Sequence, residues 1–334
     1  MTATTVGVTA HSGWWRSDRS EPVRRNLGLV AVLLILYTIG AITHPEIFLD
    51  ADRLWSNELT VLKQASSIGV ITVGMTFVMI AGGIDLSVGA LLALASVWCT
   101  TLATQSYGVG VMIFVALAVG AGAGVVNGVL IAYGRLVPFI ATLALMVAAR
   151  GLAQKISGKL TQINTVDALN QIAIDKVLGI PVLVLIMLGV GALGWLLLNR
   201  TTFGRHTFAI GGNPEAARLA GIPIRRHTVM LYALSGLCCG IAALIVTAQA
   251  TAGSSDHGNL YELQAIAAAI IGARRSPGSR HDRRLAARRP RVHPDHEPVH
   301  HQQPAARMAA DRPGRHHRRR RPRPAVPGLS AAPK

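Results

Sequence analysis

The fold of this chain is decided by an uncharged run of 49 residues, from Leu86 to Gly134: LSVGALLALASVWCTTLATQSYGVGVMIFVALAVGAGAGVVNGVLIAYG. A helix crosses a bilayer with about 20 mostly apolar residues, so this run is long enough for two spans. The turn-like residues Gln105 to Gly108 divide it near its middle. The sequence therefore predicts two membrane-spanning helices here.

Further apolar stretches lie on both sides of this run, and the whole chain is 51% hydrophobic and only 15% charged. Ordinary soluble domains carry roughly a quarter charged residues, which excludes a typical soluble enzyme. We expect an all-α, polytopic transmembrane helix bundle with about eight spans before residue 273, at about 27–43, 59–80, 85–104, 109–133, 137–154, 181–198, 228–250 and 263 onward. The three cysteines lie in apolar stretches and two are adjacent, so we expect neither a disulfide scaffold nor a zinc site.

The placement of arginine predicts the orientation of the bundle. Four arginines precede the first span within residues 1–26, and five lie in the segment 200–227. Short cytoplasmic loops are enriched in Lys and Arg, and both segments fall on the same side when the eight spans are counted. We therefore expect a multi-pass membrane protein with residues 1–26 in the cytoplasm.

One polar motif, AGGIDLSVG at residues 81–89, interrupts the apolar region. Its notable members are Gly82, Gly83, Asp85, Ser87 and Gly89. The paired glycines break a helix, and Asp85 or Ser87 can cap the next one by accepting backbone N–H bonds. Because an acid beside a span is costly, a gate or a polar lining is the alternative to a simple cap. A proton relay is the weakest alternative, since no second acid or histidine lies nearby in the sequence.

The segment 200–227 holds a second motif. Asn213 before Pro214 is typical of a helix start, a short helix-forming segment follows, and Gly221 is placed to end it. The residues that we single out are Gly212, Asn213, Glu215, Ala216, Ala217 and Gly221. So short a helix is marginal alone, and we therefore expect either an ordinary amphipathic connector or a helix that docks on another protein.

Small and polar residues inside the spans allow two interpretations. Gly120, Gly124 and Gly128 repeat every four residues and share one helix face, which favours close helix packing over a pathway lining. Scattered polar side chains in the spans are able to hydrogen-bond a polyol, namely Gln64, Ser66, Ser67, Asn127 and Thr142.

The motif at 81–89 and its preceding residues 74–80 resemble the hallmark of sugar-type ABC importer permeases, the ribose, xylose, arabinose and galactose group. The stretches 204–223 and 264–272 are similar to the same family, and the resemblance covers residues 27 to 272. It implies a 27–272 permease domain, with 200–227 as the cytoplasmic loop that meets an ATPase subunit.

The resemblance further implies transport of a ribose-like monosaccharide delivered by an extracytoplasmic sugar-binding protein. The implied partners are a cytoplasmic ABC ATPase, a second permease subunit as homodimer or heterodimer, and the lipid bilayer. The chain contains no G-x-x-x-x-G-K-[ST] loop, so we expect no enzyme activity and no cofactor in this chain, with ATP and Mg bound by the ATPase. Alternatives are an ABC permease for a nucleoside, inositol or a branched-chain amino acid, or an ion-coupled secondary transporter that uses Asp85.

Residues 273–334 depart from this pattern. They carry 17 of the 33 Lys and Arg, 10 of the 16 prolines and 7 of the 12 histidines, and we expect them to be disordered. Such a composition also fits a tail that binds nucleic acid or lipid, or a translation in the wrong reading frame. When codons compatible with this tail are read one base later, basic and polar residues become apolar ones. We therefore favour a frameshift near Ala273 and expect no nucleic-acid partner.

Overall fold

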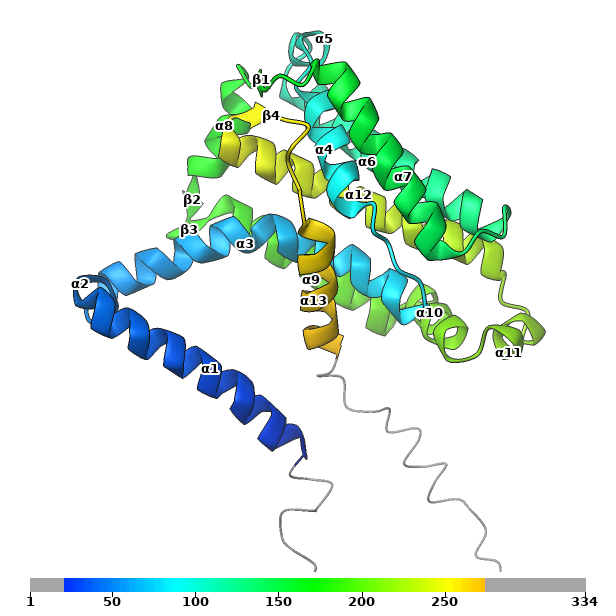
Figure 1. The fold of residues 1–334 in the computed structure, drawn as a ribbon, viewed down its shortest axis with the longest axis horizontal. Coiled ribbons are helices and arrows are strands. Elements are labelled where there is room, and N and C mark those ends of the chain that lie inside the picture. The colour runs from blue at the N-terminus through cyan, green and yellow to red at the C-terminus, as the bar shows by residue number, and fades with distance from the viewer. Residues whose placement is uncertain (1–20, 274–334) are drawn as a thin grey trace, which may run out of the picture. The chain divides into compact units, whose positions relative to one another are not determined.

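The computed structural model describes residues 21–273, and the tail expected to be disordered lies outside them. The described part is almost entirely helical (Figure 1). Its helices are α1 (Glu21–Thr43), α2 (Pro45–Phe48), α3 (Ala51–Ile80), α4 (Val88–Cys99), α5 (Leu102–Gln105), α6 (Val109–Ala132), α7 (Pro138–Ser157), α8 (Asp167–Ile174), α9 (Val182–Arg200), α10 (Thr202–Gly212), α11 (Pro214–Leu219), α12 (Ile224–Ala250) and α13 (Tyr261–Ala273).

Two-residue strands form small antiparallel pairs in the loops. β1 (Gln162–Ile163) pairs with β4 (Ala252–Gly253), and β2 (Lys176–Val177) pairs with β3 (Ile180–Pro181). The first pair connects the loop after α7 to the end of α12. The all-α helix bundle predicted from the sequence is confirmed.

Within residues 21–273, five helices are long and apolar enough to cross a membrane: α3, α6, α7, α9 and α12. Three of the eight predicted spans correspond to shorter apolar helical stretches, Val30–Thr43 within α1, Val88–Cys99 and Tyr261–Gly272. The span expected at 85–104 is divided, because α4 ends at Cys99 and the separate helix α5 follows. The Thr101 hydroxyl accepts a hydrogen bond from the Thr104 amide and caps α5, which stabilises this division.

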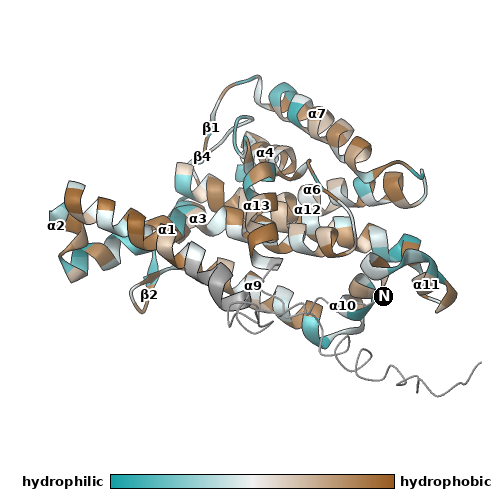
Figure 2. Cartoon of the chain, turned by 60° about the horizontal axis from the view of Figure 1, so that its bottom comes forward, coloured by the Kyte–Doolittle hydropathy of each residue, from teal (hydrophilic) through white to brown (hydrophobic). Residues whose placement is uncertain are grey.

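Helix α12 lies at the centre of the bundle, in contact with α3, α4, α6 and α8. Most side chains of the buried core come from α3, α4, α6 and α12, among them Ile71, Leu91, Met112 and Cys239, and α7, α8, α9 and α13 contribute the rest. Apolar residues also cover the outer faces of the helices (Figure 2), as Leu193 and Trp195 of α9 show with exposed fractions of 67% and 57%. A protein surrounded by lipid exposes such residues, so this surface agrees with a membrane environment.

The glycines of α6 permit its close packing on α12. A Cβ added to Gly128 would lie 2.6 Å from the Val229 Cα, and one added to Gly120 or Gly124 would overlap the backbone carbonyl of Gly236 or Tyr232. The packing role predicted for these glycines is confirmed, since backbones meet directly along this face.

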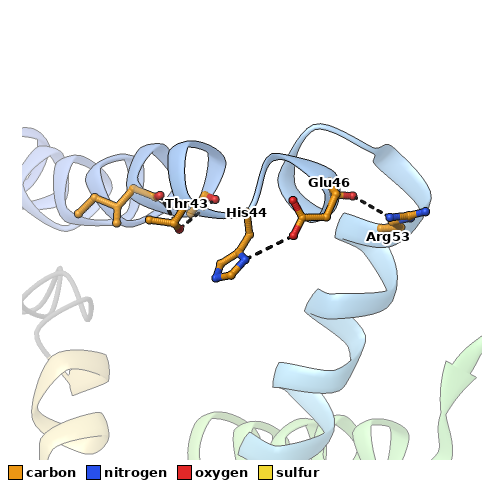
Figure 3. Close-up of polar contacts among 6 residues, drawn as sticks. Thr43, His44, Glu46 and Arg53 are labelled. Atoms are coloured by element: carbon orange, nitrogen blue, oxygen red, sulfur yellow. Dashed lines mark hydrogen bonds and ion pairs between the residues drawn. The ribbon is translucent and has the colours of Figure 1, made fainter.

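The connection between α1 and α3 is a polar corner, which Figure 3 shows. His44 Nδ1 lies 3.4 Å from Glu46 Oε1, and Arg53 Nη1 donates to the Glu46 carbonyl at 3.5 Å. These side chains are well exposed, so the contacts contribute little to stability.

Candidate functional site

The motif at 81–89 forms a non-helical connection between α3 and α4, which we call the first break (residues 81–87). Gly82 has a φ of +84°, a conformation that favours glycine. A Cβ added to Gly83 would lie 2.7 Å from the Tyr232 hydroxyl of α12. The two glycines therefore allow the chain to turn sharply while it lies against α12.

Asp85 is completely buried in this break and accepts three hydrogen bonds. Its Oδ1 accepts from the Ser87 amide at 3.0 Å and from the Ser87 hydroxyl at 2.6 Å, and its Oδ2 accepts from the Ser235 hydroxyl of α12 at 2.9 Å. The bond from the Ser87 amide closes a local turn before α4, and the N-cap residue Ser87 makes no side-chain capping hydrogen bond, so the prediction that Asp85 or Ser87 caps α4 is wrong. The bond from Ser235 adds a tertiary link that the local sequence did not indicate.

The network continues into α6. Asn127 Nδ2 donates to the Ser87 hydroxyl at 2.9 Å, and both side chains are fully buried. Asn127 Oδ1 has no hydrogen-bond partner within residues 21–273. Hydrogen bonds in a medium of low dielectric are costly to break, so this network fixes the first break against α6 and α12.

The start of α4 meets a second non-helical connection, which we call the second break (residues 251–260), between α12 and α13. A Cβ added to Gly89 would overlap the Gly258 carbonyl and would lie 2.8 Å from Glu262 Oε2. The starts of α4 and α13 therefore touch, and the two helices run in opposite directions from this point (Figure 1).

Arg150 of α7 holds the second break in place. Its Nη1 donates to the carbonyl of Ser255 and, at 2.8 Å, to the carbonyl of His257. A further contact joins His257 Nδ1 to the Ser96 hydroxyl of α4 at 3.1 Å. In the sequence, Arg150 stands out only as a single charge within an apolar run. Its binding to a segment 105 residues away was not predicted, because no local pattern marks it.

At another part of the structure, residues 200–227 fold into α10 and α11. The Asn213 side chain accepts a hydrogen bond from the Ala216 amide at 3.0 Å, and Pro214 occupies the first turn of α11. Gly221 follows with a φ of +82°. The predicted short helix and its two end signals are thus confirmed, whereas α10 was not predicted.

Helix α11 is exposed, whereas α10 packs on the bundle. Of the residues predicted to matter here, only Ala217 is buried; Gly212, Asn213, Glu215, Ala216 and Gly221 are exposed. In α10, a Cβ added to Gly211 would overlap the Ile80 carbonyl and lie 3.3 Å from the Ala81 Cα. Helix α10 therefore contacts the junction between α3 and the first break.

A second contact connects α10 to α12. The Thr207 hydroxyl lies 2.9 Å from His227 Nε2, and the Phe203 ring packs on the same imidazole with ring centroids 4.5 Å apart. The two predicted groups of site residues are therefore separate in space, but α10 contacts helices that also support the Asp85 network.

The scattered polar residues of the spans do not gather into one lining. Ser66 and Thr142 are buried and donate to carbonyls of their own helices, Lys63 at 2.6 Å and Pro138 at 3.0 Å. Gln64 is exposed. Within residues 21–273, no group of three His, Cys, Asp or Glu side chains is arranged to hold a metal ion.

Comparison with known families decides the class of the protein. Residues 57–279 match the family model described as branched-chain amino acid transport system / permease component. The chain belongs to this family. It is a membrane transport component and not an enzyme, in agreement with the resemblance to sugar-type ABC permeases.

Curated relatives in this permease family are named for sugars. The ribose import permease protein of Bacillus subtilis (strain 168) is 39% identical over 262 residues, 78% of this chain and 80% of the relative. The galactofuranose transporter permease protein of Escherichia coli (strain K12) is 36% identical, over 75% of each chain. The D-allose permease protein of the same strain is 35% identical, over 73% of this chain and 74% of its own. No solved structure matches this one significantly.

Proposed function

We propose that this chain is the membrane-spanning permease subunit of an ABC importer that moves a ribose-like monosaccharide. The observation that carries the proposal is the contact of α10 with the end of α3, next to the first break. An exposed short helix, α11, is joined through α10 to the helices that hold the membrane motif. This arrangement is suited to receiving movement from a protein docked on α11.

The proposed partners follow from this assignment. A cytoplasmic ABC ATPase binds ATP and Mg and docks on α11, an extracytoplasmic sugar-binding protein delivers the solute, and a second permease subunit completes the pathway. Residues 1–26 and the segment 200–227 face the cytoplasm of a bacterium, since their arginines follow the positive-inside rule.

The proposed mechanism is alternating access driven by differential nucleotide affinity. Nucleotide binding closes the ATPase dimer and moves α11. Helix α10 transmits this movement to α3 through Gly211 and to α12 through Thr207 and Phe203. Because α3 leads into the first break and α12 carries Ser235, the displacement reaches the Asp85 network.

The geometry disfavours an ion-coupled transporter that uses Asp85. Both carboxylate oxygens accept hydrogen bonds from Ser87 or Ser235, and the side chain has no exposed surface. A proton or sodium site needs access to water on alternate sides. The uptake experiment that tests ribose also tests whether the chain transports another small solute, such as a nucleoside, inositol or a branched-chain amino acid.

The test is uptake by proteoliposomes that contain the product of this chain's own gene together with an ABC ATPase and a sugar-binding protein from the same organism. We expect D-ribose accumulation that requires ATP on the ATPase side. Uptake that persists without ATP or without the ATPase would contradict the proposal. If inositol, a nucleoside or leucine competes for uptake and ribose does not, the proposed substrate is wrong but the assignment as an ABC importer permease stands.

A substitution in α10 tests the coupling path. Gly211→Ala places a methyl group against the Ile80 carbonyl, and overpacking of this kind costs typically about 1–3 kcal/mol. We expect uptake to fall about tenfold or more, while the amount of folded protein changes little because α10 lies at the edge of the bundle. Gly191→Ala in α9, where an added Cβ meets open space, is the control and should transport normally. Equal uptake by both variants would refute this coupling path.

We also propose that residues 273–334 are an out-of-frame product and not a binding tail. The family match ends at residue 279, which supports a boundary in this region. Sequencing the gene provides the test: an open shifted frame that encodes apolar, glycine-rich residues supports the proposal, and early stop codons in that frame refute it. Nucleic-acid binding by the chain that disappears on removal of residues 274–334 would also refute it.

A further inference from the structure

Helix α7 and the start of α13 enclose a cleft of about 460 Å³. One side of it comes from α7 and the other from the end of the second break and the first turn of α13. Its polar lining consists of Arg150, Gln154, Asn259 and Glu262, with Met146, Val147 and Leu260 as apolar neighbours. Asn259 is exposed, and the other three polar residues are partly exposed.

The cleft lies at the depth of the bilayer. Helix α4 contains 12 residues, so at about 1.5 Å per residue it covers roughly two-thirds of a hydrocarbon core about 30 Å thick, and α13 runs in the opposite direction from the same point (Figure 1). Their starts meet at Gly89 and Gly258, and therefore lie inside the core. Glu262 is in the first turn of α13, and Arg150 lies in the middle part of α7.

Ionisable side chains at this depth do not face lipid without a large cost, and normally face water or protein. The cleft is thus unlike the outer face of α9, where the accessible side chains, such as Leu193, are apolar. A pathway for a hydrophilic solute requires such a polar surface inside the membrane.

The polar groups of the cleft favour an uncharged ligand. Arg150 directs Nη1 at the Ser255 and His257 carbonyls, so it acts as a positioning residue for the loop that carries Asn259. Gln154 and Asn259 supply both donors and acceptors, and Glu262 supplies acceptors. Hydroxyl groups, which donate and accept, match this set. The volume lies in the range of small-molecule sites.

We propose that this cleft is a section of the solute pathway and binds a neutral polyhydroxylated solute, with Gln154, Asn259 and Glu262 as its hydrogen-bonding residues. The proposal rests on the transport function proposed above and deepens it. It assigns the solute contacts to the second break and α7, and not to the Asp85 motif.

Cysteine accessibility tests the cleft independently of transport. The natural cysteines Cys99, Cys238 and Cys239 are buried, so they provide a low background. We expect the full-length Asn259→Cys and Gln154→Cys variants in membranes to react with a small hydrophilic thiol reagent at least tenfold faster than Leu193→Cys. Millimolar D-ribose should slow their reaction several-fold.

Each contrary result overturns the proposal. Reaction as slow as that of Leu193→Cys shows that lipid or protein covers the cleft. Fast reaction that no sugar or polyol slows shows that the cleft does not bind the solute, and protection by leucine alone shows that the ligand is a zwitterion.

A second variant measures the role of Glu262 in the assembled transporter. Glu262→Gln keeps the shape of the side chain, and we expect the KM for D-ribose to rise about tenfold. Glu46→Gln in the exposed corner is the matched control. An unchanged KM refutes the role of Glu262. Absence of ATP-driven uptake by the unsubstituted chain contradicts the proposed function instead, and leaves the labelling result valid.

Discussion

The two breaks in the helical bundle meet through the start of α4, which follows the first break and touches the second, and they are nonetheless built differently. In the first break, Asp85 and Ser87 are buried and hydrogen-bonded to one another and to neighbouring helices. In the second break, Asp256 and Asn259 are exposed, and the contacts from Arg150 are made to backbone carbonyls. The first break uses its side chains to hold itself together, whereas the second contacts α4 through His257 and leaves Asp256 and Asn259 exposed.

This difference shows that a conspicuous polar motif in a membrane sequence need not be the surface that contacts the cargo. The Asp85 motif is prominent because a buried turn needs specific residues to satisfy its backbone. In the second break, an arginine from another helix satisfies the backbone carbonyls of Ser255 and His257. Its exposed side chains, Asp256 and Asn259, are therefore available for other roles.

The largest expected effect comes from Asp85→Ala. It removes the acceptor of three buried hydrogen bonds, and each unsatisfied donor costs about 1–3 kcal/mol. We expect the unfolding midpoint in detergent to fall by about 10 °C, since 1 kcal/mol corresponds to about 2–4 °C in a chain of this size. The midpoint is measured by heating samples to a series of temperatures and determining the folded fraction of each by size-exclusion chromatography.

Asp256→Ala is the matched control in the second break, because this side chain is exposed. We expect a shift below about 1 °C for this variant, as for most exposed positions. Asp85→Asn keeps one acceptor oxygen, so its unfolding midpoint should fall by less than that of Asp85→Ala and by more than that of Asp256→Ala. Equal shifts for Asp85→Ala and Asp256→Ala would remove the contrast between the breaks.

A smaller effect is expected where the breaks meet. Gly89→Ala places a methyl group against the Gly258 carbonyl and forces α4 and α13 apart, at a cost of about 1–3 kcal/mol. The unfolding midpoint should fall by several degrees. Gly110→Ala in α6 meets open space and should be neutral or slightly stabilising, by at most about 1 kcal/mol. If the Gly89→Ala and Gly110→Ala variants are equally stable, the start of α4 does not touch the second break as described.

The smallest effect on global stability is expected from Arg150→Ala, which releases only the second break. We expect amide hydrogen exchange within residues 254–258 to accelerate about tenfold, equivalent to about 1.4 kcal/mol of local opening. Exchange in the first break should not change. Lys155→Ala, an exposed position on the same helix, is the control. Acceleration in both breaks would show that they open together.

Local signals in the sequence predicted much of this structure. The charge-free runs indicated α3, α6, α7, α9 and α12. Asn213, Pro214 and Gly221 indicated α11, because caps and turns depend on neighbouring residues. The spacing of Gly120, Gly124 and Gly128 indicated a packing face for the same reason.

The features that the sequence did not predict depend on distant partners. Ser235 lies 150 residues from Asp85, and no local pattern joins them. The gap between the spans predicted at 228–250 and 263 onward located the second break, but nothing in its sequence indicated that Arg150 of α7 binds its carbonyls. Helix α10 was missed because its contacts with Ile80 and His227, and not its own periodicity, stabilise it.

The glycine face between α6 and α12 has a mechanical consequence. Where backbone meets backbone, no flexible side chain is available to change rotamer and absorb a displacement, so neither helix can slide or roll against the other without a clash. These two helices form a rigid pair. We therefore expect the conformational cycle of this permease to move the pair as one body, with the change of shape taken up by the helices around it.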